Sequence, residues 1–315
     1  MTSRFVRAGH ARLRVLAAVA AVAACLVPAT AQAAVTPLTI ETQNLYLGAD
    51  LTPAIAAQNA GQFFAAANQI WANVKASDPA ARMGKIADEI ATAKPDIVAL
   101  QEVSKWTATN FGTSEPSFDF LTLLQSALSA RGQSYTVAST SNNANIGPIP
   151  LPAGTPTPPF FLLTFQDRDV ILVRNRPGLT FSNPQNANFA AQQTLTTPVG
   201  PLSFNRGWAS IDGTVGGRSF HFVDTHLETE SFPTVQVAEG NELLAGPLSG
   251  PGTQIAAGDF NSAADGSTTR TYANLTAVFK DAWINGNQAS RGFTCCQAAD
   301  LLNKLSTLSE RIDLV

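Results

Sequence analysis

A short, entirely apolar run is the feature that most limits how this chain can fold. Residues 97–100 (IVAL) follow Pro95, and the polar residue Glu102 comes two positions after the run. A run of this length is expected for a strand that is buried on both of its faces. Residues 79–93, just before it, carry apolar side chains at helical spacing. The sequence therefore predicts an α/β fold, with helices packed outside a sheet.

Other segments give weaker signals of the same two periodicities. We predict further helices at 52–75, 118–131, 234–246 and 298–308, and strands at 37–45, 169–174, 203–212, 254–260 and 311–315. The clearest hairpin lies in 206–226, where a turn at Gly213 to Gly217 separates two alternating runs. Residues 146–162 contain six prolines, which prevent sheet pairing, so we expect a loop there. Such a loop is either a simple surface excursion or a lip that touches substrate or lipid.

The first 33 residues have the pattern of a secretory signal peptide. Four arginines precede an apolar run at 15–27, which is too short to cross a bilayer, and Ala31 and Ala33 suit a cleavage after Ala33. We therefore assign 1–33 to the signal peptide and 34–315 to one domain, and we expect a secreted, extracellular protein. Cys25 ends a lipobox-like VAAC sequence, which leaves a membrane-attached lipoprotein as the alternative.

Removal of this leader makes the chain more acidic. The whole chain has 20 basic and 23 acidic residues, and the leader takes four arginines, which leaves 16 and 23 and a net charge of −7. A basic face for nucleic acid is not evident, but a nuclease is not excluded, because a bound cation can supply positive charge locally. The remaining cysteines, Cys295 and Cys296, are adjacent. They are either bonded to each other, which an oxidising compartment permits, or free thiols.

Polar side chains follow several of the predicted strands. They are Asn44, Glu102, His226, Asp259 and Asn261. Each alone has a structural explanation, such as a turn, a helix cap, a return to solvent or a buried core histidine. Strand ends of α/β sheets, however, gather at one rim where ligands bind. Five such groups together predict a functional site.

The order of these motifs resembles that of a known superfamily. The successive segments are NLYLGAD, PDIVALQEV, RGWASID, FVDTHLE, AAGDFNS and RIDLV. They are similar to the motifs of the endonuclease/exonuclease/phosphatase superfamily, which includes pancreatic-type deoxyribonucleases, abasic-site endonucleases, inositol-polyphosphate phosphatases and bacterial sphingomyelinases. The resemblance covers roughly residues 37–315. It implies a four-layer α/β sandwich, in which two packed, mostly antiparallel β-sheets are flanked by helices.

The resemblance also implies a metal site. Glu102 corresponds to the carboxylate that binds the catalytic Mg²⁺, with Mn²⁺ or Ca²⁺ as alternatives, and Asn44 corresponds to the amide that helps to position it. Asp259 supplies a second carboxylate on a neighbouring strand end. Mg²⁺ needs only one or two carboxylates besides water and substrate phosphate, so this donor set is sufficient.

The remaining implied roles concern the phosphate group. Asp259 and Asn261 correspond to the pair that orients the attacking water and contacts phosphate, and His226 to the histidine that donates to a phosphate oxygen. Asp313 corresponds to the acid that holds a second, distant histidine. Arg206 is a candidate phosphate contact or a structural ion pair.

The sequence departs from the superfamily pattern near its end. The last superfamily motif is Ser-Asp-His after one more strand, whereas this sequence stops at Val315, soon after Asp313. We therefore expect a fragment that lacks the last strand and this motif. If the chain is the whole product, hydrolysis is expected to be severely weakened.

The function expected from these residues is divalent-metal-dependent hydrolysis of phosphodiester or phosphomonoester bonds by a secreted enzyme. Nucleic acid is slightly favoured as substrate, and a phospholipase C or sphingomyelinase-like activity on a phospholipid head group is the alternative. A catalytically silent binding protein of the same fold is a second alternative. We expect a monomer with no stable protein partner.

Overall fold

The computed structural model describes residues 36–152, 154–286 and 289–315. The predicted signal peptide and Cys25 lie outside these residues. The helices, in chain order, are α1 (Thr52–Ile55), α2 (Ala60–Ala76), α3 (Pro79–Ala93), α4 (Phe120–Ala130), α5 (Pro233–Ala245), α6 (Thr271–Thr276) and α7 (Ala282–Gly286). None of the helices in these residues is both long and apolar enough to cross a bilayer.

The strands form two sheets. They are β1 (Ile40–Asn44), β2 (Ile97–Gln101), β3 (Lys105–Phe111), β4 (Phe118–Asp119), β5 (Tyr135–Leu151), β6 (Phe160–Arg174), β7 (Leu179–Asn188), β8 (Gln193–Thr197), β9 (Gly200–Phe204), β10 (Gly207–Val215), β11 (Arg218–His226), β12 (Gln254–Asp259) and β13 (Asp313–Leu314). The first sheet has the order β1-β2-β6-β5-β9-β8, and β3 pairs with β6 and β4. The second has the order β13-β12-β11-β10-β7. Each sheet contains one parallel pair, β1 with β2 and β11 with β12, and the other pairings are antiparallel.

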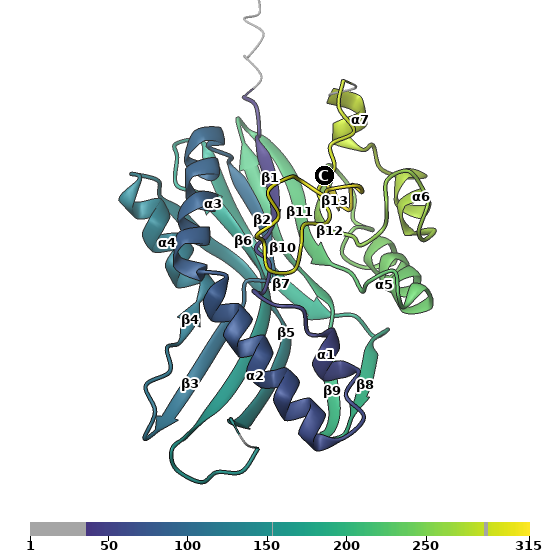
Figure 1. Cartoon of the computed structure of the whole chain (residues 1–315). Coiled ribbons are helices and arrows are strands. Elements are labelled where there is room, and N and C mark those ends of the chain that lie inside the picture. Colours follow the sequence, from purple (N-terminus) through teal and green to yellow (C-terminus); the bar gives the residue numbers. More distant parts are fainter. Residues whose placement is uncertain (1–35, 153, 287–288) are drawn as a thin grey trace, which may run out of the picture. The chain divides into compact units, whose positions relative to one another are not determined.

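The buried apolar residues show how the layers stack. One cluster joins α2, α3 and α4 to the outer face of the first sheet, a second lies between the sheets, and a third joins α5 and α6 to the second sheet. Figure 1 shows the two groups of helices on opposite sides of the sheets. In β2, Val98 and Leu100 face the helices, whereas Ile97 and Ala99 face the other sheet. The predicted α/β sandwich of two mostly antiparallel sheets is confirmed.

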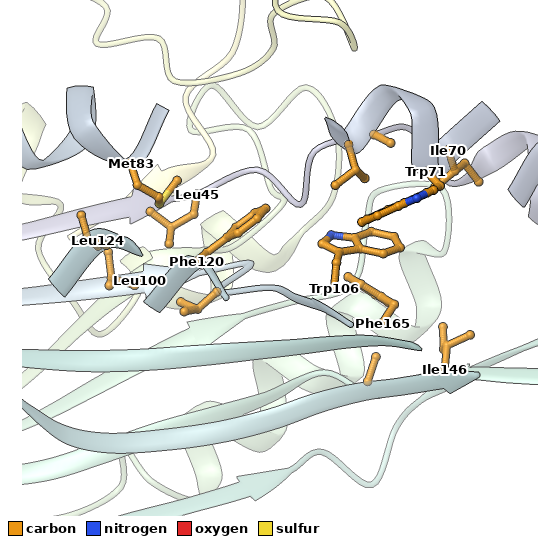
Figure 2. Packing of buried hydrophobic residues seen from close by; sticks show 14 of the residues in the cluster. Leu45, Ile70, Trp71, Met83, Leu100, Trp106, Phe120, Leu124, Ile146 and Phe165 are labelled. Atoms are coloured by element: carbon orange, nitrogen blue, oxygen red, sulfur yellow. The ribbon is translucent and has the colours of Figure 1, made fainter. Parts of the chain in front are cut away.

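The core under the first group of helices is centred on aromatic rings. The indole of Trp106 lies between Trp71 and Phe165, with ring centroids 6.2 and 4.4 Å away (Figure 2). Its Nε1 donates a hydrogen bond to the carbonyl oxygen of Leu47 at 2.9 Å. Trp106 therefore connects the core to the loop that follows β1.

The predicted helix at 52–75 is divided in two. The side chain of Asn59 accepts a hydrogen bond from the backbone of Gln62 and so caps the start of α2. The predicted helix at 298–308 is wrong, because that segment is irregular. There the side chains of Gln297 and Asn303 bond to backbone groups of the segment itself, which competes with helix formation.

The prediction of a loop throughout 146–162 is also wrong in part. β5 continues to Leu151 and pairs with β6 beyond a register shift between Ile146 and Ile149. Pro148 falls in that irregularity, and Pro150 lies where β5 has β6 as its only recorded neighbour among the described strands. Prolines are tolerated at bulges and at sheet edges, so they interrupt this strand without ending it.

The predicted strand at 203–212 consists of two strands in different sheets. β9 ends at Phe204 in the first sheet and β10 begins at Gly207 in the second, so the chain crosses between sheets at Asn205 and Arg206. The hairpin that follows is confirmed with a shorter turn. Only Gly216 and Gly217 form it, and both have positive φ, as a two-residue hairpin turn requires.

Two aspartates are buried between the sheets. Asp169 accepts a hydrogen bond from Asn143 at 2.7 Å, and Asp224 accepts one from Gln101 at 2.7 Å. The second carboxylate oxygen of each has no hydrogen-bond partner within the described residues. Burial raises the pKa of both groups well above the ordinary value, and in Asp169 the nearby Asp224 adds to the effect. The pair is therefore most stable when protonated.

Replacing Trp106 by alanine is expected to lower the free energy of unfolding by about 3–5 kcal/mol, because it leaves a cavity between two rings and an unpaired carbonyl. Urea denaturation followed by circular dichroism measures the change. Val278→Ala, at a residue that is 69% exposed, should change stability by less than about 0.5 kcal/mol. Equal losses in the two variants would contradict the assigned core.

Asp224→Asn is expected to stabilise the protein more at pH 8 than at pH 5. A carboxyl whose pKa is raised on folding loses stability as pH rises from about 4 through the raised value, and asparagine does not titrate. The gain should be about 1.4 kcal/mol for each unit of pKa shift removed. Urea denaturation in EDTA at the two pH values measures it. A gain of the same size at both pH values would show that the aspartate does not carry this shift.

Candidate active site

The four ends of the two parallel strand pairs carry most of the predicted site residues. Asn44 ends β1 and Glu102 follows β2, and these strands are in register with Asn44 opposite Gln101. His226 ends β11 and Asp259 ends β12, where they are opposite each other. Each sheet therefore contributes two neighbouring strand ends to one rim.

The amide of Asn44 joins the two sheets at this rim. Its Nδ2 donates to Glu102 Oε1 at 3.3 Å and to Asp259 Oδ2 at 3.0 Å. Its Oδ1 accepts from the backbone of Tyr46 at 2.8 Å, which fixes the orientation of the amide. The backbone of Leu47 donates to Glu102 Oε2 at 2.6 Å. The two carboxylates are thus held by one side chain although they are far apart in sequence.

The backbone at the two motifs is unusual in the same way. Glu102 has φ of 51° and Asn261 has φ of 47°, a left-handed conformation that non-glycine residues rarely adopt. Such residues persist where surrounding structure fixes them, and they cluster at functional sites. Gly258, before Asp259, has a different constraint, since a Cβ there would collide with the carbonyl oxygen of Thr225. Glycine therefore allows β12 to approach β11 closely.

Burial and mutual repulsion raise the pKa of the clustered carboxylates. Burial, followed by the charge of Asp167, raises the pKa of Glu102 to about 7. Burial raises the pKa of Asp259, and burial together with Asp259 raises the pKa of Asp313 to about 8. The carboxylates therefore lie where additional positive charge would stabilise their ionised forms.

His226 and Arg206 lie beside these carboxylates. His226 is 2% exposed, and its Nδ1 and Nε2 are 2.9 and 3.1 Å from Arg206 Nη1. Its Nε2 is 3.7 Å from Asp259 Oδ2. Burial, and then Arg206, lower the pKa of His226 well below its ordinary value, so the imidazole is neutral near pH 7. A neutral imidazole still has one N–H to donate.

Asn261 and Asp313 complete the predicted set. The backbone of Asn261 donates to Asp259 Oδ1 at 2.9 Å, and its Nδ2 donates to the carbonyl of Leu227 at 2.8 Å. Asp313 pairs with Asp259 across β12 and β13. Its Oδ1 is buried without a partner among the described residues. All seven predicted residues therefore belong to one connected group around Asp259.

Several polar residues that face this group were not predicted. Asp167 on β6 accepts from Ser104 at 3.2 Å, and its charge acts on Glu102 and Arg206. Glu228 Oε1 lies 3.6 Å from Arg206 Nη2. Asp167 stands two residues before Asp169 in an alternating strand, which was a usable signal for a shared face. The contact of Glu228 depends on tertiary structure.

The donor set is suitable for a hard divalent cation. Within the described residues, no three or more histidine, cysteine, aspartate and glutamate side chains are grouped closely enough to hold an ion by themselves. Glu102 and Asp259 nevertheless provide two carboxylates on one amide, and Asp313 adds a buried oxygen without a partner. Mg²⁺ binds through one or two carboxylates and completes its shell with water and phosphate oxygens, so these residues fit it.

A family profile matches nearly all of this region. The profile of the Endonuclease/Exonuclease/phosphatase family matches residues 44–314. The chain belongs to this family. Its members are hydrolases that act on phosphoester bonds. The superfamily resemblance inferred from the motifs is therefore confirmed. No curated protein is similar enough in sequence to count as a match.

Solved structures show the same fold at low sequence identity. An endonuclease/exonuclease/phosphatase family protein from Leptotrichia buccalis C-1013-b is 17% identical, with a TM-score of 0.51, over 74% of this chain and 79% of that one. D. rerio TDP2 complexed with a single strand DNA product is 16% identical, with a TM-score of 0.46, over 74% of each chain. A mannosyl-6-phosphatase of Bacteroides thetaiotaomicron VPI-5482 is 16% identical, with a TM-score of 0.45, over 88% of this chain and 84% of that one.

Asn44→Ala is expected to destabilise the metal-free protein by about 1–3 kcal/mol, because two buried carboxylates lose their shared donor. Urea denaturation at pH 8 in EDTA measures the loss. Asn183→Ala, which removes an exposed amide bonded to Asp212, is the matched control and should cost less than about 0.5 kcal/mol. A stability of Asn44→Ala equal to that of the control would argue against the bridging role.

Proposed function

We propose that this protein is a divalent-metal-dependent phosphoesterase, with nucleic acid as the slightly favoured substrate. The observation that supports the proposal most is the single amide, Asn44, that holds Glu102 and Asp259 together beside His226 and Arg206. Carboxylates, a neutral imidazole and a guanidinium are the groups that phosphoryl transfer to water needs.

Glu102 and Asp259 would hold the cation, and Asn44 would set the position of their oxygens. A bound Mg²⁺ or Mn²⁺ supplies Lewis-acid stabilisation of the charge on the phosphoryl oxygens. The raised pKa of Asp259 makes this carboxylate a better acceptor for the proton of an attacking water than an ordinary aspartate. Asn261 keeps the Asp259 carboxylate in place through its backbone N–H.

His226 and Arg206 would act on the phosphate group itself. The neutral imidazole donates its N–H to a non-bridging oxygen, and the guanidinium pairs with the phosphate charge. Both side chains are largely enclosed by protein, where such interactions are stronger than in water. Asp313 would reinforce the negative potential that attracts a cation.

The preference for nucleic acid depends on where the enzyme works. We propose that the protein is secreted, with attachment through a lipid on Cys25 as the alternative, and a secreted phosphodiesterase would encounter nucleic acid outside the cell. The expectation of a monomer without a stable protein partner is kept as part of this proposal.

One observation favours a phospholipid head group instead. Leu302 and Leu305 are 77% and 81% exposed in the segment that follows α7. This segment is attached near the site, because the hydroxyl of Tyr46 donates to the carbonyl of Ala299 at 2.5 Å. Exposed leucines beside a phosphoesterase site would suit an enzyme that works at a lipid surface.

Glu102→Ala and His226→Ala are each expected to lower the rate of hydrolysis by at least about 100-fold, because each removes a group that stabilises the transition state. The substrates are plasmid DNA, RNA, sphingomyelin and bis-p-nitrophenyl phosphate, with Mg²⁺ or Mn²⁺ and with EDTA. We expect EDTA to stop turnover. Mn²⁺ should raise the melting temperature of the wild type, and Glu102→Ala should abolish that shift.

His221→Ala is the matched control, since its histidine is paired with Asp212 away from the site and should leave the rate unchanged. Faster cleavage of sphingomyelin than of either nucleic acid would support the phospholipid alternative. Absence of turnover of every substrate would support a catalytically silent binding protein and would sink the enzyme proposal.

A further inference from the structure

Helix α5 turns polar side chains, rather than only apolar ones, toward the protein interior. Its buried residues include Gln236 and Glu239, and both are 0% exposed. The two are three positions apart, so they lie on the same face of the helix. Burying an amide and a carboxyl costs free energy that leucine would not cost, unless their bonds serve a purpose. Their partners are therefore informative.

Gln236 holds the loop that carries Asn261. Its Nε2 donates to the backbone carbonyl of Asn261 at 2.5 Å. Its Oε1 accepts from the hydroxyls of Thr269 and Thr271, which fixes the orientation of the amide. The bond supports Asn261 at the position where the backbone is left-handed. Gln236 thus determines where the residue after Asp259-Phe260 lies.

Glu239 holds the loop that carries Glu228. Its Oε2 accepts from the backbone N–H of Glu228 at 2.6 Å. The carboxylate of Glu228 in turn accepts from Thr229 at 2.7 Å and lies 3.6 Å from Arg206. Arg206 contacts His226. A continuous series of contacts therefore runs from α5 to the guanidinium at the site.

One helix thus reaches two different loops of the candidate active site through neighbouring turns. Nothing in an apolar stripe could give this result, because apolar contacts do not fix backbone direction. The buried Oε1 of Glu239 and Nε of Arg206 have no partner within the described residues, so neither is there to maximise hydrogen bonding. The arrangement costs stability and fixes geometry.

We propose that Gln236 and Glu239 are positioning residues of the active site, Gln236 acting through Asn261 and Glu239 acting through Glu228 on Arg206. The proposal depends on the phosphoesterase function proposed above for its kinetic consequence. It assigns the position of two phosphate-binding groups to a helix that itself touches no substrate.

The test compares Glu239→Ala and Gln236→Ala with the wild type on bis-p-nitrophenyl phosphate in Mn²⁺. We expect each to lower kcat by about ten- to hundred-fold, because displacement of a catalytic group by a fraction of an ångström has effects of this size. Glu239→Gln retains an acceptor for the Glu228 N–H and should recover most of the activity. The matched control is Glu242→Ala on the same helix, whose carboxylate accepts the backbone N–H groups of Ala190 and Ala191. It should change stability without changing kcat.

Double variants separate positioning from general destabilisation. The effect of Glu239→Ala should disappear when Arg206 is already alanine, whereas that of Gln236→Ala should remain, because it acts through Asn261. Conversely, Gln236→Ala should have no further effect on Asn261→Ala. Effects on kcat that add in every combination, or a Glu242→Ala variant as slow as Glu239→Ala, would overturn the proposal.

Binding of inorganic phosphate gives a readout that does not require turnover. Calorimetry in Mn²⁺ should show at least about five-fold weaker phosphate binding for Glu239→Ala and unchanged binding for Glu242→Ala. If the wild type binds phosphate but cleaves no substrate, the phosphoesterase proposal fails while this comparison still tests the positioning role. Equal phosphate affinity of the two variants would overturn the positioning role.

Discussion

The apolar contact between the two sheets is the constraint on which the rest of the molecule depends. Ile97 and Ala99 of the first sheet are buried in the same cluster as Phe222 and Ala257 of the second. Because these residues lie in the parallel strand pairs, packing them also places the pairs' ends at a common rim. The amide of Asn44 can then reach a carboxylate of its own sheet and one of the opposite sheet. The chemistry is thus a consequence of how the sheets pack.

The same packing explains why the interior is electrostatically expensive. Carboxylates gather around Asp259 and, deeper, at Asp169 and Asp224, where burial raises their pKa values. A fold selected for stability alone would place apolar residues at such positions. Arg206 is the cation that faces several of these groups, including Glu102 and Asp167. The protein therefore holds a concentrated negative region with limited internal compensation, which is the environment in which a cation or a proton binds.

Much of this arrangement could be predicted from the sequence, because it is local in origin. The run at 97–100 indicated a doubly buried strand, and each polar residue of the site immediately followed a strand signal. The strands β3, β7 and β8 were not predicted, since their exposed, polar faces give little periodicity. The segment 298–308 looked helical by composition, yet Asn303 and Gln297 bind its backbone. Partners such as Asp167 and Glu239 become visible only when distant segments meet.

The passage of the chain from one sheet to the other has a mechanical consequence. Arg206 stands at the point where β9 of the first sheet gives way to β10 of the second, so its backbone belongs to neither layer. A small slide of one sheet over the other would move this guanidinium relative to His226, even if each sheet stayed rigid. The alignment of the two layers is thereby read out at a single cationic group, and substitutions far from the rim that alter the interlayer spacing would be felt there first.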